Sequence, residues 1–225
     1  MRTPRLVAAL LVALACLFVL PATAFAAERS DTAPLAPAPL GGGSPLFFAS
    51  SGSRCVAAFA ATGGGNGFLI TGIGCGTPGE TVTSGNNIVV GVVTSAPISA
   101  AVTVVRVTNT VDWVLVGRVD GVVIGGSTEA PVGATVCMLG STTGRHCGTI
   151  TAKNQTVAFP TGVITGLTRT TVCSEPGDGG APFFSGDQAQ GILVGGSGNC
   201  TVGGTTFFQP INPILAAFGI TLLAG

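Results

Sequence analysis

The residues that could do chemistry are few, and most of them surround one glycine-rich stretch. Residues 173–184 read Cys-Ser-Glu-Pro-Gly-Asp-Gly-Gly-Ala-Pro-Phe-Phe. A Gly-Asp-Gly-Gly run forms a tight turn. Position 179 is glycine, so no hydroxyl follows Asp178 to act as a nucleophile. Taken alone, the stretch therefore predicts an ordinary turn without a nucleophile.

Side chains that can move a proton near neutral pH are equally scarce. His146 is the only histidine, and the chain has one lysine, Lys153, and no tyrosine. A general base must lie within hydrogen-bond reach of the proton that it removes. Because His146 adjoins Cys147 in a different part of the chain, we expect a structural or surface histidine there. Ser174 and Ser185 flank the glycine-rich turn, but neither occupies its apex.

The composition is that of an all-β protein with many tight turns. The chain has 225 residues, of which 36 are glycine and 8% are charged, and its net charge is zero. No basic surface is expected, which argues against nucleic-acid binding. Short apolar runs rich in Val, Ile and Thr recur about every 8 to 14 residues, and this spacing favours a β-sandwich or a β-barrel. The predicted strands are 55–61, 67–71, 87–93, 101–107, 113–119, 135–139, 147–153, 156–159, 166–171, 182–185, 189–194 and 206–210.

Two groups of strands and a short helix organise the chain. The strands divide near residues 125–131 into an N-terminal group over 46–124 and a C-terminal group over 131–211. Each group has roughly six strands, which is typical of a double β-barrel. Pro213 precedes a run of apolar residues and predicts a short helix over 213–219.

The N-terminus is typical of an exported protein. Basic residues precede an apolar run over 6–20, and small residues at 24–26 form a cleavage site. We therefore predict a signal peptide over 1–26, a flexible Pro/Gly-rich leader over 27–45, and secretion of the mature chain. A lipid anchor on Cys16 is the alternative.

Six cysteines remain once the signal peptide is removed. An even number in an exported chain predicts three disulfides, with the pairing left open by spacing alone. Zinc is the competing interpretation, but the sequence has no Cys-x-x-Cys pair and only one histidine. We expect neither a metal nor a cofactor. The six are Cys55, Cys75, Cys137, Cys147, Cys173 and Cys200.

Four blocks of sequence resemble the secreted bacterial chymotrypsin-like serine proteases, the streptogrisin and α-lytic protease group. The first resembles the Leu-Thr-Ala-Gly-His-Cys block, the second a small disulfide hairpin, the third the nucleophile loop, and the fourth the substrate-binding strand. In chain order they are 68–75, 137–154, 173–184 and 190–200. The resemblance implies a trypsin-like protease domain over 46–225, folded as a double six-stranded antiparallel β-barrel.

The same resemblance implies a degenerate active site. Gly74 stands in place of the general-base histidine, Gly179 stands in place of the nucleophilic serine, and Asp112 is retained as the orienting aspartate. Val194 replaces a serine that would hydrogen-bond this aspartate. In a serine protease, loss of the nucleophile or the base alone lowers kcat by about 10⁶-fold. The resemblance therefore implies a protease fold without protease chemistry.

The resemblance also implies binding residues and disulfides. Gly177 and Gly179 would form the oxyanion hole, and the strand Val194, Gly195, Gly196 and Ser197 would bind substrate. The implied disulfides are Cys55–Cys75, Cys137–Cys147 and Cys173–Cys200.

One further departure concerns Asp178. In the family the buried aspartate at this place pairs with an arginine, and the arginine position here holds Met138. An unpaired buried carboxylate is costly, so we expect Asp178 either to be protonated or to accept from another donor, with Arg145 as a candidate.

Three functions are open at this point. The first is a secreted, catalytically inactive homologue that binds extended peptides or proteins in its cleft, as a monomer and without a membrane or nucleic-acid partner. The second is an active serine-type endopeptidase that uses a relocated group. The third is a structural or interaction domain with a vestigial cleft.

Overall fold

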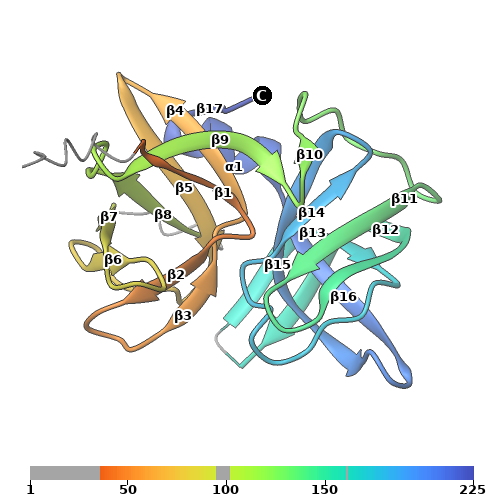
Figure 1. The fold of residues 1–225 in the computed structure, drawn as a ribbon. Coiled ribbons are helices and arrows are strands. Elements are labelled where there is room, and N and C mark those ends of the chain that lie inside the picture. The colour runs from red at the N-terminus through yellow and green to blue at the C-terminus, as the bar shows by residue number, and fades with distance from the viewer. Residues whose placement is uncertain (1–35, 95–101, 161) are drawn as a thin grey trace, which may run out of the picture. The chain divides into compact units, whose positions relative to one another are not determined.

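The computed structural model describes residues 36–94, 102–160 and 162–225 (Figure 1). This part of the chain consists of two curled β-sheet systems and one short helix. The predicted all-β, chymotrypsin-like fold class is confirmed. The predicted signal peptide lies outside the described residues, as does the leader up to residue 35.

Most of the strands are short, as the glycine content predicts, whereas β12 has 16 residues and β15 has 12. Those of the N-terminal half are β1 (Ala38–Gly42), β2 (Pro45–Phe48), β3 (Arg54–Val56), β4 (Phe59–Gly63), β5 (Asn66–Gly72), β6 (Thr81–Thr83), β7 (Val89–Val93), β8 (Val102–Val107), β9 (Trp113–Val119) and β10 (Val122–Val123). Those that follow are β11 (Thr135–Gly140), β12 (Gly144–Phe159), β13 (Gly162–Thr170), β14 (Pro182–Ser185), β15 (Gln188–Asn199), β16 (Gly203–Pro210) and β17 (Thr221–Leu222).

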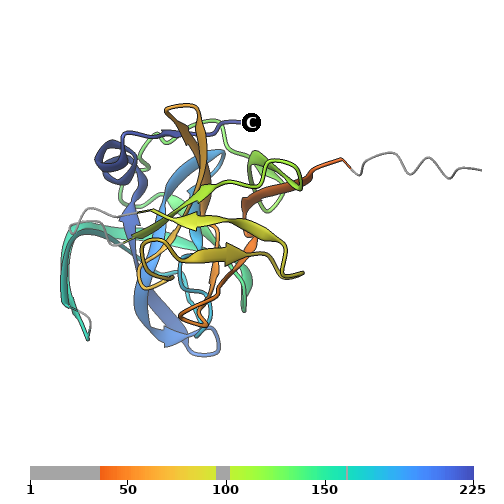
Figure 2. The ribbon, with the colours of Figure 1, turned by 90° about the vertical axis from the view of Figure 1, so that its left-hand side faces the viewer.

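The C-terminal half closes into a six-stranded barrel in the order β11-β12-β13-β16-β15-β14. Alternate residues of its strands point inward, so that Val136 and Met138 of β11 are fully buried. Phe183 and Phe208 stack inside the barrel with their ring centroids 4.8 Å apart. The hairpin of β12 and β13 extends from this barrel as a long curved arm (Figure 2).

The N-terminal half is a curled sheet in the order β17-β4-β5-β8-β7-β6-β2-β3, next to a three-stranded sheet, β1-β9-β10. Strand β1 runs parallel to β9, with Ala38 opposite Trp113. Leu40 of β1 is 2% exposed. The prediction of a flexible leader up to residue 45 is therefore wrong for its last part, because this segment pairs with β9 and buries an apolar side chain.

A buried apolar cluster joins the two halves. It contains Phe59 and Ile70 from the N-terminal sheet, Phe184 and Ile192 from the C-terminal barrel, and Ile211 from the helix. The halves therefore share a hydrophobic core, which fixes the segments that meet between them.

Helix α1 (Ile211–Phe218) begins two residues before the predicted start at Pro213. It ends at Gly219, whose φ of 61° is the left-handed conformation common at helix ends. The chain then returns to the N-terminal half, where β17 pairs with β4. The described residues contain no helix that is long and apolar enough to cross a membrane.

All three disulfides have the pairing that the resemblance implies: Cys55–Cys75, Cys137–Cys147 and Cys173–Cys200. The first joins β3 to the turn after β5, the second joins β11 to β12, and the third joins the glycine-rich turn to the end of β15.

Candidate functional site

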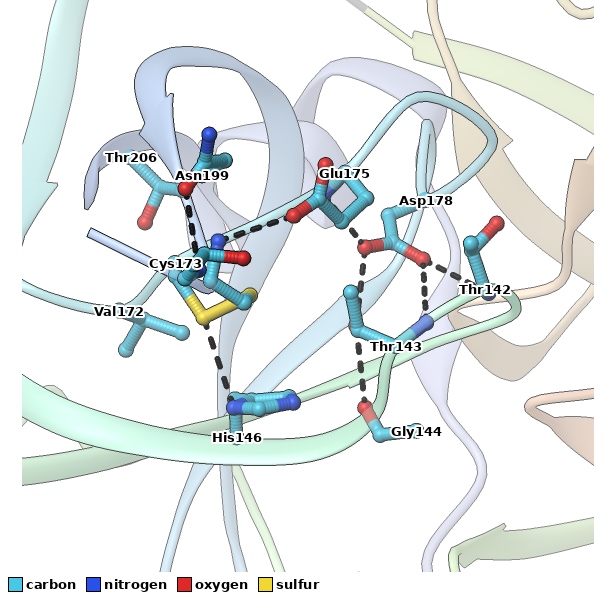
Figure 3. The surroundings of a disulfide bond; sticks show 12 residues. Thr142, Thr143, Gly144, His146, Val172, Cys173, Glu175, Asp178, Asn199 and Thr206 are labelled. Carbon is cyan, nitrogen blue, oxygen red and sulfur yellow. Dashed lines mark hydrogen bonds between the residues drawn. A yellow bond between two sulfur atoms is a disulfide. The ribbon is translucent and has the colours of Figure 1, made fainter. Parts of the chain in front are cut away.

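The glycine-rich turn between β13 and β14 is built around the buried carboxylate of Asp178, which is 0% exposed. Oδ1 accepts hydrogen bonds from the backbone N–H groups of Thr142 (2.8 Å) and Thr143 (3.2 Å). Oδ2 accepts from the Thr143 hydroxyl and from the Glu175 N–H, each at 2.9 Å. Figure 3 shows these donors converging on the carboxylate. Four donors replace the missing arginine, because hydrogen bonding satisfies a buried charge that lacks an ion-pair partner.

Arg145 is not the partner of Asp178, so that prediction was wrong. Its Nε lies 3.1 Å from Oδ2 of Asp120, and its guanidinium lies 5.0 Å from the centroid of the Phe184 ring. The donors that hold Asp178 instead come mainly from the Thr142-Thr143 turn of the disulfide hairpin. Three of the four donors are backbone N–H groups, so no pattern of residue types in the sequence identifies them.

The turn meets the end of β5 through two glycines. A Cβ atom built on Gly72 would lie 2.7 Å from Cα of Gly180, and one built on Gly180 would lie 2.6 Å from N of Gly72. Backbone therefore packs against backbone here, and this contact brings the segment after β5 to the glycine-rich turn. Gly180 also has a φ of 85°, which side chains rarely adopt.

Gly74 and Gly179 lie on either side of this contact, and both open to solvent. A Cβ atom at either position would find no other atom within 4 Å. The two differ in conformation, because Gly74 has a φ of 79° whereas Gly179 lies outside the left-handed region. The structure thus brings together the two segments assigned to base and nucleophile, and both positions carry backbone alone.

The turn that carries Gly74 is fixed on its far side by Glu80. Its carboxylate accepts from the backbone N–H groups of Ser50 (2.6 Å), Ser51 (2.8 Å) and Thr77 (2.9 Å). The N–H of Ser51, followed by that of Thr77, holds the pKa of Glu80 below its usual value. An ionised Glu80 therefore ties the β2–β3 loop to the segment that follows Gly74.

Asp112 is not part of this assembly. The ladder between β5 and β8 has Gly72 opposite Val102 at one end and Gly67 opposite Val107 at the other. At about 3.4 Å per residue these ends lie roughly 17 Å apart. Gly74 follows the first end, and Asp112 follows the second.

Local contacts of Asp112 agree with this placement. Its exposed carboxylate accepts a hydrogen bond from the amide of Asn109 at 2.7 Å, and the same amide donates to the carbonyl of Val89 at 2.9 Å. Asp112 therefore cannot orient a group at position 74, and its assignment as the retained triad aspartate was wrong. Strands β8 and β9 both contain an apolar run, so the sequence does not show which of them lies beside the segment that carries Gly74.

The segment that does lie beside Gly72 is the start of β8. Residues 95–101, which precede it, read Ser-Ala-Pro-Ile-Ser-Ala-Ala. This sequence contains no carboxylate, so it holds no residue that could serve as the acid of a triad.

Strand β15 supplies the wall of a cavity of about 310 Å³. Leu193 and Val194 line it from β15, together with Gly195 and Gly196, and the glycine-rich turn lines the opposite side. Beyond Leu193, whose N–H donates to Ala181, the described ladder of β15 continues only with β16. The other edge, which includes Ser197, faces no paired strand among the described residues.

Two residues were not predicted, one that lines this cavity and one that lies against its wall. Glu175 lines it and accepts a hydrogen bond from the Cys200 N–H at 2.9 Å through Oε1. The ring of Phe159, near the tip of the β12–β13 arm, lies where a side chain on Gly195 would point, with its Cε1 atom 2.8 Å from an ideal Cβ. Neither residue belongs to a short motif, so only the folded chain reveals the contacts.

His146 lies beside the Cys173–Cys200 disulfide, with Nδ1 3.4 Å from Sγ of Cys173 (Figure 3). It is opposite Met138 in the β11–β12 ladder, and it does not line the cavity. In the described part of the chain these two cysteines and His146 form the single group with metal-like spacing. Because both sulfur atoms are in a disulfide, the group has no thiolate to bind a metal.

Comparisons with known proteins agree with this architecture. A family model described as Trypsin matches residues 102–217. Streptogrisin-C of Streptomyces griseus is 45% identical over 201 residues, which are 87% of this chain and 43% of that protein. Glutamyl endopeptidase 2 of Streptomyces griseus is 36% identical over 190 residues, which are 80% of this chain and 98% of that protein.

A solved structure, Protease A of Thermobifida fusca, is 42% identical and superposes with a TM-score of 0.74 over 84% of this chain and 100% of that one. The chain spans less than half the length of Streptogrisin-C and of Streptogrisin-D, which it covers to 43% and 47%. The β-barrel fold, the three disulfides and these similarities together show that the chain belongs to the trypsin family, among the bacterial chymotrypsin-like serine proteases.

Proposed function

We propose that this chain is an exported, catalytically inactive member of the family that binds an extended peptide segment in its cleft without cleaving it. The observation that carries the proposal is the pair Gly74 and Gly179. Both open to solvent beside the Gly72–Gly180 contact, and neither has a side chain that can attack a carbonyl or accept a proton. A triad acts as a unit, so the remaining backbone would support only a small residual rate.

The cleft nevertheless keeps what a peptide needs for binding. The edge of β15 beyond Leu193 can pair with an added strand through main-chain hydrogen bonds. The cavity of about 310 Å³ beside it can take one side chain of that peptide. Gly177 and Gly179 line the cavity, and their N–H groups can serve a peptide carbonyl because oxyanion donors belong to the backbone.

Export and a monomeric state are part of the proposal. The apolar N-terminal run followed by a small-residue cleavage site supports export. The three disulfides support an oxidising compartment.

The test combines hydrolysis and binding on the same purified chain. We expect no turnover of peptide or ester substrates, no reaction with a serine-directed phosphonate, and saturable binding of an extended peptide from a random library. Gly179→Phe should abolish binding without unfolding the protein, because a side chain there meets no neighbour and would fill the mouth of the cavity. Val202→Phe is the matched control, since Val202 is 80% exposed and does not line the cavity.

Two results would reject the proposal in different ways. Turnover by the wild-type chain that disappears in His146→Ala would show an active endopeptidase with a relocated base. Absence of both turnover and peptide binding would leave a structural domain with a vestigial cleft.

A further inference from the structure

The Cys173–Cys200 disulfide joins the two walls of the cavity beside β15. Cys173 begins the glycine-rich turn that lines one wall, and Cys200 follows β15, which lines the other. Among the described residues, one hydrogen bond also joins segments 173–179 and 194–200, from the Cys200 N–H to Oε1 of Glu175. The disulfide is therefore the main link that fixes the distance between the walls.

Each wall has its own attachment to the barrel. The turn is bound through the Asp178 carboxylate and through the Thr142 hydroxyl, which donates to the carbonyl of Pro176 at 3.1 Å. The end of β15 pairs with β16 as far as Asn199, which lies opposite Gly203. Because neither attachment involves a sulfur atom, we expect cleavage of the disulfide to loosen the cavity while the barrel stays folded.

The imidazole of His146 lies beside this disulfide (Figure 3). Its Nδ1 is 3.4 Å from Sγ of Cys173, and a ring nitrogen of His146 and the two sulfur atoms all lie within 4.8 Å of one another. Cys147 adjoins His146 in β12, but successive side chains of a strand point to opposite faces. Because the chain has no other histidine, this disulfide alone has an imidazole beside it.

A histidine in this position favours cleavage of the sulfur–sulfur bond by a dithiol. A thiolate of the dithiol attacks Sγ of Cys200, the disulfide bond breaks, and the electron pair leaves on Sγ of Cys173. The protonated imidazole of His146 stabilises this thiolate, and a leaving thiolate of lower pKa departs faster. The second thiol then attacks the mixed disulfide and releases Cys200. Two electrons and two protons pass to the cysteines, and the dithiol becomes a disulfide.

Access to solvent also distinguishes the three disulfides. Cys55 and Cys75 are 8% and 2% exposed, so the sulfur atoms in the N-terminal half are shielded from an external thiolate. Cys173 and Cys200 are half-buried. Cys147 is exposed, so the disulfide of the β11–β12 hairpin is open to attack as well. The hairpin disulfide is therefore the comparison against which the effect of His146 can be measured.

We propose that Cys173–Cys200 is a redox switch of the cavity. A dithiol reduces it before the other two disulfides, with His146 assisting the departure of Cys173, and the two walls of the cavity then loosen. The oxidised protein is the form with the fixed cavity. Weaker peptide binding by the reduced protein follows, and this consequence alone rests on the function proposed above.

Timed reduction with dithiothreitol tests the selectivity. Samples are quenched with iodoacetamide, and mass mapping identifies the alkylated cysteines. We expect Cys173 and Cys200 to be alkylated first in the wild type. His146→Gln should slow this step about threefold to tenfold and leave the rate at the hairpin disulfide unchanged. Arg145→Gln is the matched control, because it removes a cation from the other face of β12, and it should be reduced at the wild-type rate.

Hydrogen exchange on the selectively reduced protein tests the loosening without any ligand. Deuterium uptake should rise in segments 174–179 and 194–199 and stay unchanged in β8. The affinity for a peptide that the oxidised protein binds should fall.

The proposal would be overturned by earlier reduction of the hairpin disulfide, by a wild-type rate in His146→Gln, by unchanged exchange in the two walls, or by unfolding of the whole chain. The order of reduction and the exchange are measured on the wild type and need no variant. Absence of peptide binding in the oxidised protein would reject the proposed function instead, since selective reduction and faster exchange do not depend on a peptide.

Discussion

Gly72 and Gly180 pack backbone against backbone, so that a Cβ atom on Gly72 would lie 2.7 Å from both N and Cα of Gly180. This contact joins the end of β5 to the glycine-rich turn, and it places the open positions Gly74 and Gly179 on one surface. The segments that carry positions 74 and 179 are therefore held together by backbone contacts, and neither position has a side chain.

The Gly72–Gly180 contact should be sensitive to the smallest possible side chain. We expect Gly72→Ala to lower the free energy of unfolding by about 1–3 kcal/mol, because the added methyl meets backbone that cannot rotate away. Gly179→Ala is the matched control one residue from Gly180, since its Cβ would meet nothing within 4 Å. Denaturant unfolding of both variants measures the difference, and equal stability of the two would show that the turn is not packed as described.

Restoring the serine at position 179 should be tolerated by the fold, but restoring a working base at position 74 should not succeed. Gly179→Ser should fold normally and remain inactive, because an unassisted serine hydroxyl is a weak nucleophile. Gly74→His places a side chain at a φ of 79°, which costs about 1–2 kcal/mol.

Even the double variant Gly74→His/Gly179→Ser should stay far below the activity of a complete triad, because residues 95–101 provide no carboxylate to orient the histidine. Ester hydrolysis and phosphonate labelling of the single and double variants measure the outcome. Strong activity in the double variant would show that some other group orients the base.

Asp178→Asn should destabilise the protein by about 2–4 kcal/mol. The amide keeps only one of the two acceptor oxygens of the carboxylate. Its NH₂ group then faces N–H or O–H donors that have lost their acceptor. Thermal unfolding measures the loss. Asp112→Asn is the control, since Asp112 is exposed and its neighbour Asn109 can still donate to an amide oxygen. A loss in Asp112→Asn as large as that in Asp178→Asn would contradict the surface position given to Asp112.

Glu80 should make the stability depend on pH in the acid range. Its pKa is lower in the folded protein than in the unfolded chain, where the value is about 4.3. The ionised Glu80 side chain therefore contributes fully to the free energy of unfolding at pH values above its pKa in the unfolded chain. This stabilisation is lost as the pH falls toward the pKa of Glu80 in the folded protein.

Glu80→Gln should accordingly be less stable than the wild type at pH 7, with the difference shrinking as the pH falls below about 4.3. Urea unfolding of both proteins from pH 7 to pH 3 measures it. A stability difference that stays constant over this range would show that the carboxylate is not held by the Ser51 and Thr77 amides as described.

The sequence alone determined the fold class and the number of disulfides, and it showed that positions 74 and 179 are glycine, whereas the disulfide pairing came from the family resemblance. These features depend on local signals: short β-branched runs between glycines, six cysteines in family order, and glycine at positions 74 and 179. The absence of a side chain at a given position can be read from the sequence without knowledge of the tertiary structure. Strand β1 was not predicted, because Pro39 is typical of a linker until the pairing with β9 is known, and the helix begins two residues before the predicted start at Pro213.

Only the tertiary structure decided which residues meet. Asp112 fits an apolar strand in the sequence, but the register of β5 against β8 places it at the far end of the sheet from Gly74. The donors that the disulfide hairpin provides for Asp178 lie 35 and 36 residues away in the chain, and the Ser50 and Ser51 amides that bind Glu80 lie 30 and 29 residues away. Contacts of this kind depend on strand register and sheet curvature, which many distant side chains set together, so no short motif encodes them.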